Sequence, residues 1–411
     1  MSSPSLIRRG GQVTDRWLAL ALLAVVLILS MTTWFSASAV VSQLQAEWSL
    51  SASAAAWLTI AVQLGFVCGA LVSSLLNLAD IVSPRHVVLG GSVGAMAVNG
   101  LLGIASGSAT GIPLRFATGF FLAGVYPPIL KLMSTWFRKG RGTALGILVG
   151  ALTVGSATPH LVNGLGGLDW RMVIYTTSAL TLAGGLIAEF AVGEGPFPFP
   201  RAEFDPRQTR YVFANRGVRL ASLGYFGHQW ELYAMWTWFL VFFSEELADR
   251  GGSGGSAGAY ATFAVVGIGG LGCWVGGILG DRWGRTKTAA SMMVVSGTCA
   301  VSIGLLLGAP AWLVLLVGLV WGFTVVADSA QFSTMVTELA DQAYVGTALT
   351  LQLAVGFALT GGTIWLIPLL EDALGWRWAF AFLAPGPALG VLAMLWLKSL
   401  PEAEQIAEGR G

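Results

Sequence analysis

Long runs of apolar residues recur along the 411-residue chain and constrain its fold more than any other feature of the sequence. Each run has about 20–27 residues, enough for a helix to cross the hydrocarbon core of a bilayer with some tilt. A backbone in lipid must satisfy its own hydrogen bonds, so each run is predicted to be a helix. The predicted runs are 17–43, 53–78, 87–106, 110–136, 142–164, 172–192, 218–243, 257–279, 287–307, 312–338, 346–369 and 377–397.

The composition agrees with an integral membrane protein. Only 10% of the residues are charged and 55% are hydrophobic, whereas a soluble domain carries about 25% charged residues. The formal net charge of +1 gives no electrostatic support to a nucleic-acid partner. The first run is too long for the apolar part of a secretory signal, so we expect it to remain as the first helix.

The runs fall into two sets of six, separated by a polar, proline-containing segment. The sequence therefore predicts an all-α polytopic protein with an N-terminal six-helix bundle (1–192), a linker (193–217), a C-terminal six-helix bundle (218–398) and a tail (399–411). Similar elements recur about half a chain apart. The pairs are Trp170 with Trp376, Asp80 with Asp281, and Gly119 with Gly322.

The charges predict the orientation of the bundles. With twelve spans, 17 of the basic residues fall on the face that carries both termini and the linker. Only Arg171, Arg250 and Arg377 fall on the other face, which is acidic. Because basic residues favour the cytoplasmic side, both termini and the linker are predicted to be cytoplasmic.

A glycine-punctuated charged loop, 277–287 (GILGDRWGRTK), joins the eighth and ninth runs. It resembles the loop between transmembrane helices 8 and 9 of the major facilitator superfamily, with Thr286 where the family prefers a basic residue. Arg115 followed four residues later by Gly119 is similar to the family's fourth-helix motif. More distantly, the chain resembles bacterial nitrate/nitrite-type and related anion porters, although it lacks their Asn- and Gly-rich signatures.

The resemblance implies the family's architecture and mode of action. Two six-helix lobes would rock around a midplane site lined by helices 1, 4, 7 and 10, in the plasma (inner) membrane of a bacterium. We expect a monomer whose partners are a small-molecule substrate, protons and the lipid bilayer.

Ionisable residues inside a span are costly and usually face a cavity or one another. Arg115, Glu231 and Asp328 fall on the fourth, seventh and tenth runs. His228 shares a helical face with Glu231, three residues away. Burial favours a neutral carboxyl group and a nearby cation favours the anion, so Glu231 and Asp328 are predicted proton carriers. The alternative is a permanent ion pair with Arg115 that only stabilises packing.

Other polar and aromatic side chains are candidates for substrate binding. The guanidinium of Arg115 suits a carboxylate-like anion. The remaining candidates are Trp34, Tyr126, His160, His228 and Gln352. Helix packing alone is an equal alternative for such residues.

The charged loop also suggests a gate. Asp281 can lie against a helix N-terminus, and Arg282 or Arg285 can pair with Glu338 at the end of the tenth run. We expect this pairing to latch the cytoplasmic side shut and to break when that side opens. Asp80, the counterpart of Asp281, has no equivalent acid nearby in its half, so the latch should be asymmetric.

The expected function is secondary transport of a small polar solute, with an organic anion as one candidate and the proton as coupling ion, as in a symporter. Two alternatives remain open: a proton-driven exporter of drugs or metabolites, and a non-transporting sensor or assembly protein. No nucleotide-binding loop, metal-ligand cluster or nucleophile–base pair is visible. An enzyme, a cofactor and a metal site are therefore not expected.

Overall fold

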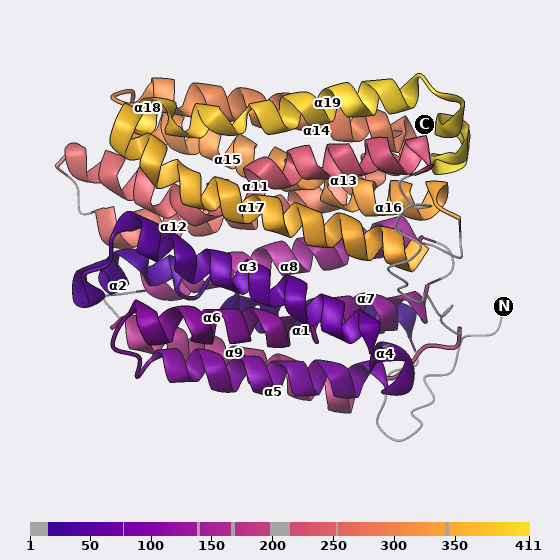
Figure 1. Cartoon of the computed structure of the whole chain (residues 1–411), viewed down its shortest axis with the longest axis horizontal. Coiled ribbons are helices and arrows are strands. Elements are labelled where there is room, and N and C mark those ends of the chain that lie inside the picture. Colours follow the sequence, from indigo (N-terminus) through magenta and orange to yellow (C-terminus); the bar gives the residue numbers. More distant parts are fainter. Residues whose placement is uncertain are drawn as a thin grey trace.

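The computed structural model describes residues 15–76, 78–137, 140–165, 169–197, 214–251, 254–341 and 345–411. All regular secondary structure in these residues is helical. The helices run roughly parallel to one long axis (Figure 1). One end of the molecule carries α4, α7, α16 and the C-terminus, and we call it the terminal face; α2 and α18 lie at the opposite end, the distal face.

The N-terminal bundle follows the six predicted runs, several of which are broken into shorter helices. Its elements are α1 (Arg16–Ser30), η1 (Met31–Thr33), η2 (Ser38–Val40), α2 (Val41–Trp48), α3 (Ala52–Leu75), α4 (Leu78–Ile81), α5 (Pro84–Leu102), α6 (Ser108–Leu122), α7 (Tyr126–Ser134), α8 (Arg141–Gly164) and α9 (Trp170–Ala191).

The C-terminal bundle repeats this pattern after the predicted linker, most of which lies outside the described residues. Its elements are α11 (Arg216–Asp249), α12 (Gly254–Gly267), α13 (Gly269–Trp283), α14 (Arg285–Ser302), η4 (Ile303–Leu306), α15 (Ala311–Ala327), α16 (Ser329–Leu339), α17 (Val345–Leu374), α18 (Trp376–Ala379), η5 (Phe380–Leu383), α19 (Pro385–Lys398), η6 (Pro401–Gln405) and η7 (Ala407–Gly409). The prediction of twelve spans in two sets of six is confirmed.

Ten of the spans in the described residues are long and apolar enough to cross a membrane by length and composition. The other two, α5 and α11, have 19 and 34 residues, so length does not exclude them. Their hydropathy is lowered by buried polar side chains, among them Asn99 on α5 and His228 and Glu231 on α11.

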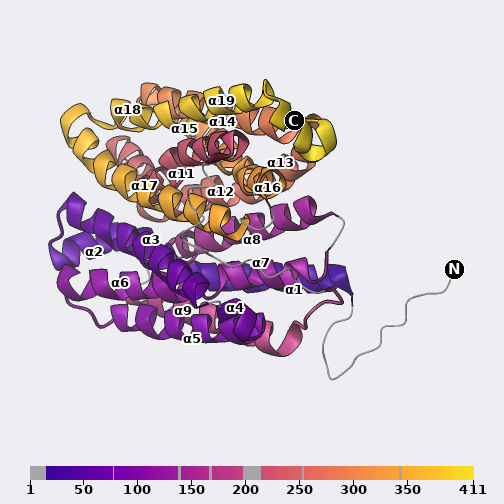
Figure 2. The ribbon, with the colours of Figure 1, turned by 45° about the vertical axis from the view of Figure 1, so that its right-hand side comes forward.

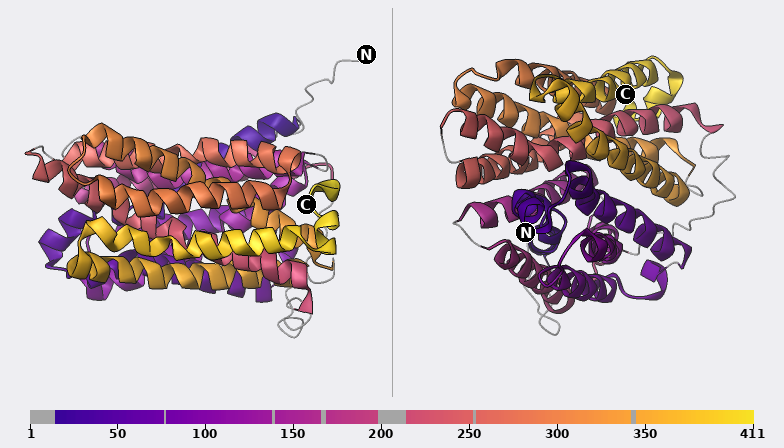
Figure 3. Two further views of the ribbon diagram at one scale, coloured as in Figure 1. Left: turned by 90° about the horizontal axis from the view of Figure 1, so that it is seen from above. Right: turned by 60° about the vertical axis from the view of Figure 1, so that its left-hand side comes forward.

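The two bundles lie side by side along their length (Figures 2 and 3). Within them, α3 packs on α6 and α5 on α9, while α11 packs on α17 and α19. The bundles meet along two seams, where α8 packs against α12 and α13, and α3 packs against α17. Any site shared by the two bundles must lie between these seams.

The internal repeat extends to side-chain contacts at the distal face. The indole Nε1 of Trp170 donates to Glu47 Oε2 at 2.5 Å, and that of Trp376 donates to Glu245 Oε2 at 2.6 Å. In the N-terminal bundle, Arg171 also binds Glu47, at 2.6 Å. The hydrogen bonds from Arg171 and Trp170 lower the pKa of Glu47 below its ordinary value.

Glycines at equivalent positions allow helix backbones to touch in both bundles. A Cβ at Gly119 of α6 would lie 2.0 Å from the carbonyl oxygen of Val62 on α3. A Cβ at Gly322 of α15 would lie 1.8 Å from the carbonyl oxygen of Val265 on α12. Only glycine permits so close an approach, as is common between membrane helices.

Gly322→Ala is therefore expected to destabilise the protein by about 3 kcal/mol, the upper end of the cost of overpacking a tight contact. The measurement is unfolding of the purified protein in a denaturing detergent. Gly362→Ala is the matched control, because a Cβ at Gly362 meets nothing within 4 Å. Equal stabilities of the two variants would contradict the close crossing of α12 and α15.

Candidate functional site

A cavity of about 460 Å³ lies between the two bundles. Its walls come from α3, α7 and α8 on one side and from α11, α16 and α17 on the other. It extends to the terminal face, where the lining residue Thr337 is exposed and Ser73 is half-buried. The molecule is thus hollow from its middle to the terminal face.

Aromatic side chains close the distal end of the cavity. We call this cluster the aromatic plug: Trp34, Phe35, Phe66, Tyr233, Trp236 and Phe357. The ring centroid of Trp34 lies 4.9 Å from that of Phe66 and 6.1 Å from that of Tyr233. Tyr233 also stacks on Phe35 at 6.1 Å and contacts Phe357 at 5.2 Å. Both bundles contribute rings, so the plug holds them together on the distal side.

Arg115 lies in the N-terminal bundle and holds the broken end of the first span. Its side chain is fully buried, and it donates only to neutral acceptors. These are the carbonyl oxygens of Leu58 (3.2 Å), Thr33 (2.8 Å) and Trp34, the hydroxyl of Ser36 (3.0 Å) and the amide oxygen of Asn99 (3.0 Å). All three of its nitrogens are engaged, and it does not line the cavity in this conformation.

Glu231 occupies a separate niche inside the C-terminal bundle. Its Oε1 accepts from the indole of Trp321 at 2.6 Å and its Oε2 from the hydroxyl of Ser296 at 2.9 Å. Glu231 is 1% exposed and Trp321 is fully buried. The carboxyl group is therefore held by two neutral donors from α14 and α15.

Asp328 and His228 form a second buried group in the same bundle. His228 Nδ1 lies 2.9 Å from Asp328 Oδ1, and both side chains are at most 2% exposed. The pair sits directly behind the cavity wall, because the flanking residues Gln229 and Ser329 line the cavity.

The expectation that Arg115, Glu231 and Asp328 converge on one pocket is wrong for this conformation. Arg115 is in the opposite bundle and is bound to neutral groups, so the alternative of a permanent ion pair with either acid is also wrong. The physical reason is that the kink of the first span supplies Arg115 with carbonyl acceptors nearer than any carboxylate.

The other predicted residues divide between the cavity and the bundle interior. Trp34, Tyr126 and Gln352 line the cavity. His160, on α8, is 1% exposed, is not part of the cavity lining, and its Nδ1 has no hydrogen-bond partner among the described residues.

The charged loop forms a cluster within the C-terminal bundle at the terminal face. Arg285 binds Glu338 in a bidentate contact, with N–O distances of 2.9–3.1 Å, and reaches Asp281 at 3.4 Å. Arg282 is exposed and is not the partner of Glu338. Asp80 lies in α4, and its side chain is outside the described part of the structure.

The predicted latch needs correction. The Arg285–Glu338 pair is intact although the cavity reaches the terminal face, and both residues belong to one bundle. The cluster instead ties the C-terminal residues to the loop: Ala407 N donates to Glu338 at 3.2 Å, and Thr286 donates to the carbonyl of Gly411 at 2.6 Å. It therefore braces one bundle and does not break when this face opens.

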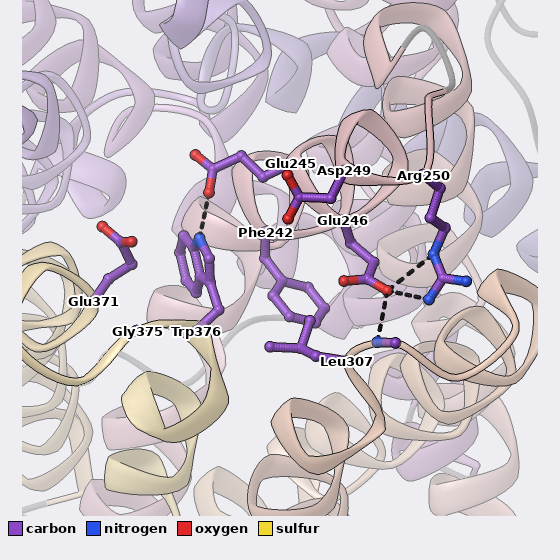
Figure 4. Close-up of a pocket in the computed structure, with 10 residues that line it drawn as sticks. Phe242, Glu245, Glu246, Asp249, Arg250, Leu307, Glu371, Gly375 and Trp376 are labelled. Carbon is purple, nitrogen blue, oxygen red and sulfur yellow. Dashed lines mark hydrogen bonds and ion pairs between the residues drawn. The ribbon is translucent and has the colours of Figure 1, made fainter.

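A second depression, of about 560 Å³, lies on the distal side of the C-terminal bundle (Figure 4). Four carboxylates line it, those of Glu245, Glu246, Asp249 and Glu371. Glu246 is bound by Arg250, and its Oε1 accepts from Gly308 N at 3.3 Å. These contacts join α11 to the loop before α15, and neither Glu231 nor Asp328 lines the depression.

Several cavity residues were not among those predicted from the sequence. Gln229, Tyr233 and Trp236 line the cavity from α11. They stand at i, i+4 and i+7, a spacing that places them on one helical face. That pattern, next to the His228–Glu231 face, is the signal that could have identified them.

Comparison with known proteins places the chain in a family. Residues 23–364 match the family model described as Major Facilitator Superfamily. The chain belongs to the major facilitator superfamily, a family of transporters. None of the curated protein sequences compared with it matches.

Solved structures of major facilitator transporters share its fold. A bacterial homolog of the human lysosomal transporter Spinster, in an inward-facing and unoccupied conformation, has a TM-score of 0.66 and 15% identity, covering 93% of this chain and 95% of its own. A D-xylose–proton symporter has a TM-score of 0.71 and 15% identity, covering 95% and 99%. The prediction of an all-helical major facilitator fold is confirmed, and the chain is a membrane transporter, not an enzyme.

Proposed function

We propose that this protein moves a small solute by alternating access, coupled to protons, with the terminal face in the cytoplasm. The observation that carries the proposal is the cavity between the bundles, which reaches one face and is closed toward the other by the aromatic plug. Such a shape is one of the two end states that a carrier needs.

The seams support a rocking motion between the two lobes, predicted as 1–192 and 218–398. At the α8–α13 seam, Gly146 and Gly150 face the backbone of Cys273 and Gly270, so few large side chains interlock. Small residues let helices approach closely and leave smooth surfaces. Opening the distal side would require the rings of the plug to separate, together with the contacts of the seams beyond it, such as that of Gly164 on α8 with Tyr260 on α12.

Proton coupling is proposed for the buried acids of the C-terminal bundle. Asp328 with His228 lies directly behind the wall, and Glu231 lies deeper on the same helix as His228. A carboxyl group without water is stable when it is protonated or paired. A proton entering from the cavity would release Asp328 from His228 and change the packing of α11 against α16. A D-xylose–proton symporter with the same fold fits this proposal.

The cytoplasmic assignment of the terminal face follows from the basic residues counted there. It makes the present conformation inward-facing, which is also the conformation of the crystallised Spinster homolog. Transport direction follows the gradients, so a symporter and an exporter share this geometry. The bacterial plasma membrane and the monomeric state remain parts of the proposal.

Spin labels test alternating access. Exposed sites suit the labels, with Ile104 and Leu374 near the distal face and Leu75 and Lys398 near the terminal face. Acidification or a transported solute is expected to lengthen the distance between labels at Ile104 and Leu374. The distance between labels at Leu75 and Lys398 is expected to shorten. A non-transporting sensor predicts no solute flux in proteoliposomes, and constant distances together with absent flux would remove the proposal.

A further inference from the structure

The charges around the cavity restrict what it can hold. Among the described residues that line it, Lys131 is the single charged one, and it lies in α7 toward the terminal face. The buried acids and Arg115 are engaged elsewhere, as described above. An ion in the inner half of the cavity would therefore lose its hydration without gaining a counter-charge, which is strongly unfavourable.

Four polar atoms of lining residues have no hydrogen-bond partner among the described residues. Three are donors: Nε1 of Trp34, Nε1 of Trp236 and Nε2 of Gln352. The fourth is an acceptor, Oε1 of Gln229, whose Nε2 donates to Tyr225. All four side chains are at most 3% exposed. Buried polar groups are nearly always paired, so these atoms are suited to a bound solute.

The same end of the cavity is rich in aromatic faces. Trp34 lies 4.9 Å from Phe66 and 5.8 Å from Phe357, measured between ring centroids. Flat π-systems pack favourably against such rings in offset or edge-to-face arrangements. Pockets of about 300–1,000 Å³ accept small organic ligands, and this cavity falls in that range.

We propose that the solute is an uncharged aromatic or heteroaromatic compound with hydrogen-bond acceptors, such as a ring carboxamide. Its ring would pack against Trp34, and its acceptors would bind Gln352 and the indole groups. This inference rests on the proposed function and replaces the sequence-based expectation of an anion.

The test is isothermal titration of the purified full-length protein in nanodiscs with two matched series at neutral pH. One series is nicotinamide, nicotinate and 3-pyridylmethylamine; the other is benzamide, benzoate and benzylamine. Each series keeps the ring and replaces the neutral amide by a carboxylate or by an aminomethyl group that is cationic at neutral pH. The amides are expected to bind at least about tenfold more tightly than the matched ions.

Two substitutions localise the binding. Gln352→Leu and Trp34→Phe each remove one donor and should weaken amide binding by about tenfold. Gln43→Leu and Trp57→Phe are the controls, because these residues are exposed and outside the cavity lining. If Trp34→Phe does not fold, Gln352→Leu decides alone.

The outcomes separate this inference from the proposed function. Tighter binding of the anions or cations, binding of no member, or unchanged binding in Gln352→Leu would overturn the inference. Flux of an ionic solute would overturn the inference and leave transport standing. Binding of the amides without flux would leave the inference standing and count against transport.

Discussion

Asp328→Asn is expected to abolish accumulation of solute driven by a pH gradient. The asparagine keeps the shape of the side chain but cannot bind or release a proton, and it cannot form an ion pair with His228. A gradient of one pH unit corresponds to about 1.36 kcal/mol, so one proton per solute supports about tenfold accumulation. The variant should reach a ratio of about 1, while exchange of solute across the membrane continues.

The measurement is uptake into proteoliposomes with and without an imposed pH gradient, using a solute that binds in titration. Asp372→Asn is the matched control, because this aspartate is exposed near the distal face. Glu231→Gln in the same assay shows whether the deeper acid also takes part. Accumulation by Asp328→Asn at the wild-type level would refute the role of the pair in coupling.

Arg115→Lys is expected to destabilise the protein by roughly 2–6 kcal/mol, because at least two buried acceptors would lose their donor at about 1–3 kcal/mol each. Arginine carries five N–H donors in a planar fork, whereas lysine has three on one atom. The carbonyls of Thr33, Trp34 and Leu58 point to positions that one ammonium group cannot serve together.

The check is thermal unfolding of the purified variant beside Arg377→Lys, which changes an exposed arginine. Because Trp34 belongs to the aromatic plug, the variant should also loosen the plug. A more accessible distal side would appear as faster labelling of Ala37→Cys, which is buried and lies outside the plug, in a protein whose exposed Cys68 has been replaced. Unchanged stability of Arg115→Lys would show that Arg115 does not hold the first span.

The spans could be predicted because hydropathy is a local property, and lipid imposes one length and one backbone geometry on each segment. The repeat could be predicted for the same reason, since Gly119 and Gly322 stand at equivalent points of similar helices. The hydrogen-bond partners of Arg115 could not be predicted from the sequence. They depend on a break in the first span between η1 and η2, which an apolar run does not reveal.

The candidate site shows the same division. The residues Glu231 and His228 could be found as polar groups on α11, but a helix has two faces and the sequence does not say which one meets the cavity. Packing turns Gln229 and Tyr233 toward the cavity. It leaves His228, paired with Asp328, one layer behind the cavity wall. The pairing of Arg285 with Glu338 could be predicted, and the structure contains it. That the pair stays intact while the cavity reaches this face could not be predicted, because it depends on how the two bundles are arranged in space.

The glycine crossings described for α6 on α3 and for α15 on α12 have a mechanical consequence. A Cβ at Gly119 or Gly322 would lie 2.0 or 1.8 Å from a backbone oxygen, against 3.1 and 2.8 Å at the seam glycines Gly146 and Gly150. The crossed pairs are packed more tightly than the seam, so each is expected to move as one stiff strut. Conformational change must then be carried by movement of whole struts relative to each other. A distance between two points of one strut should stay constant, while distances between the halves at the distal and terminal faces vary.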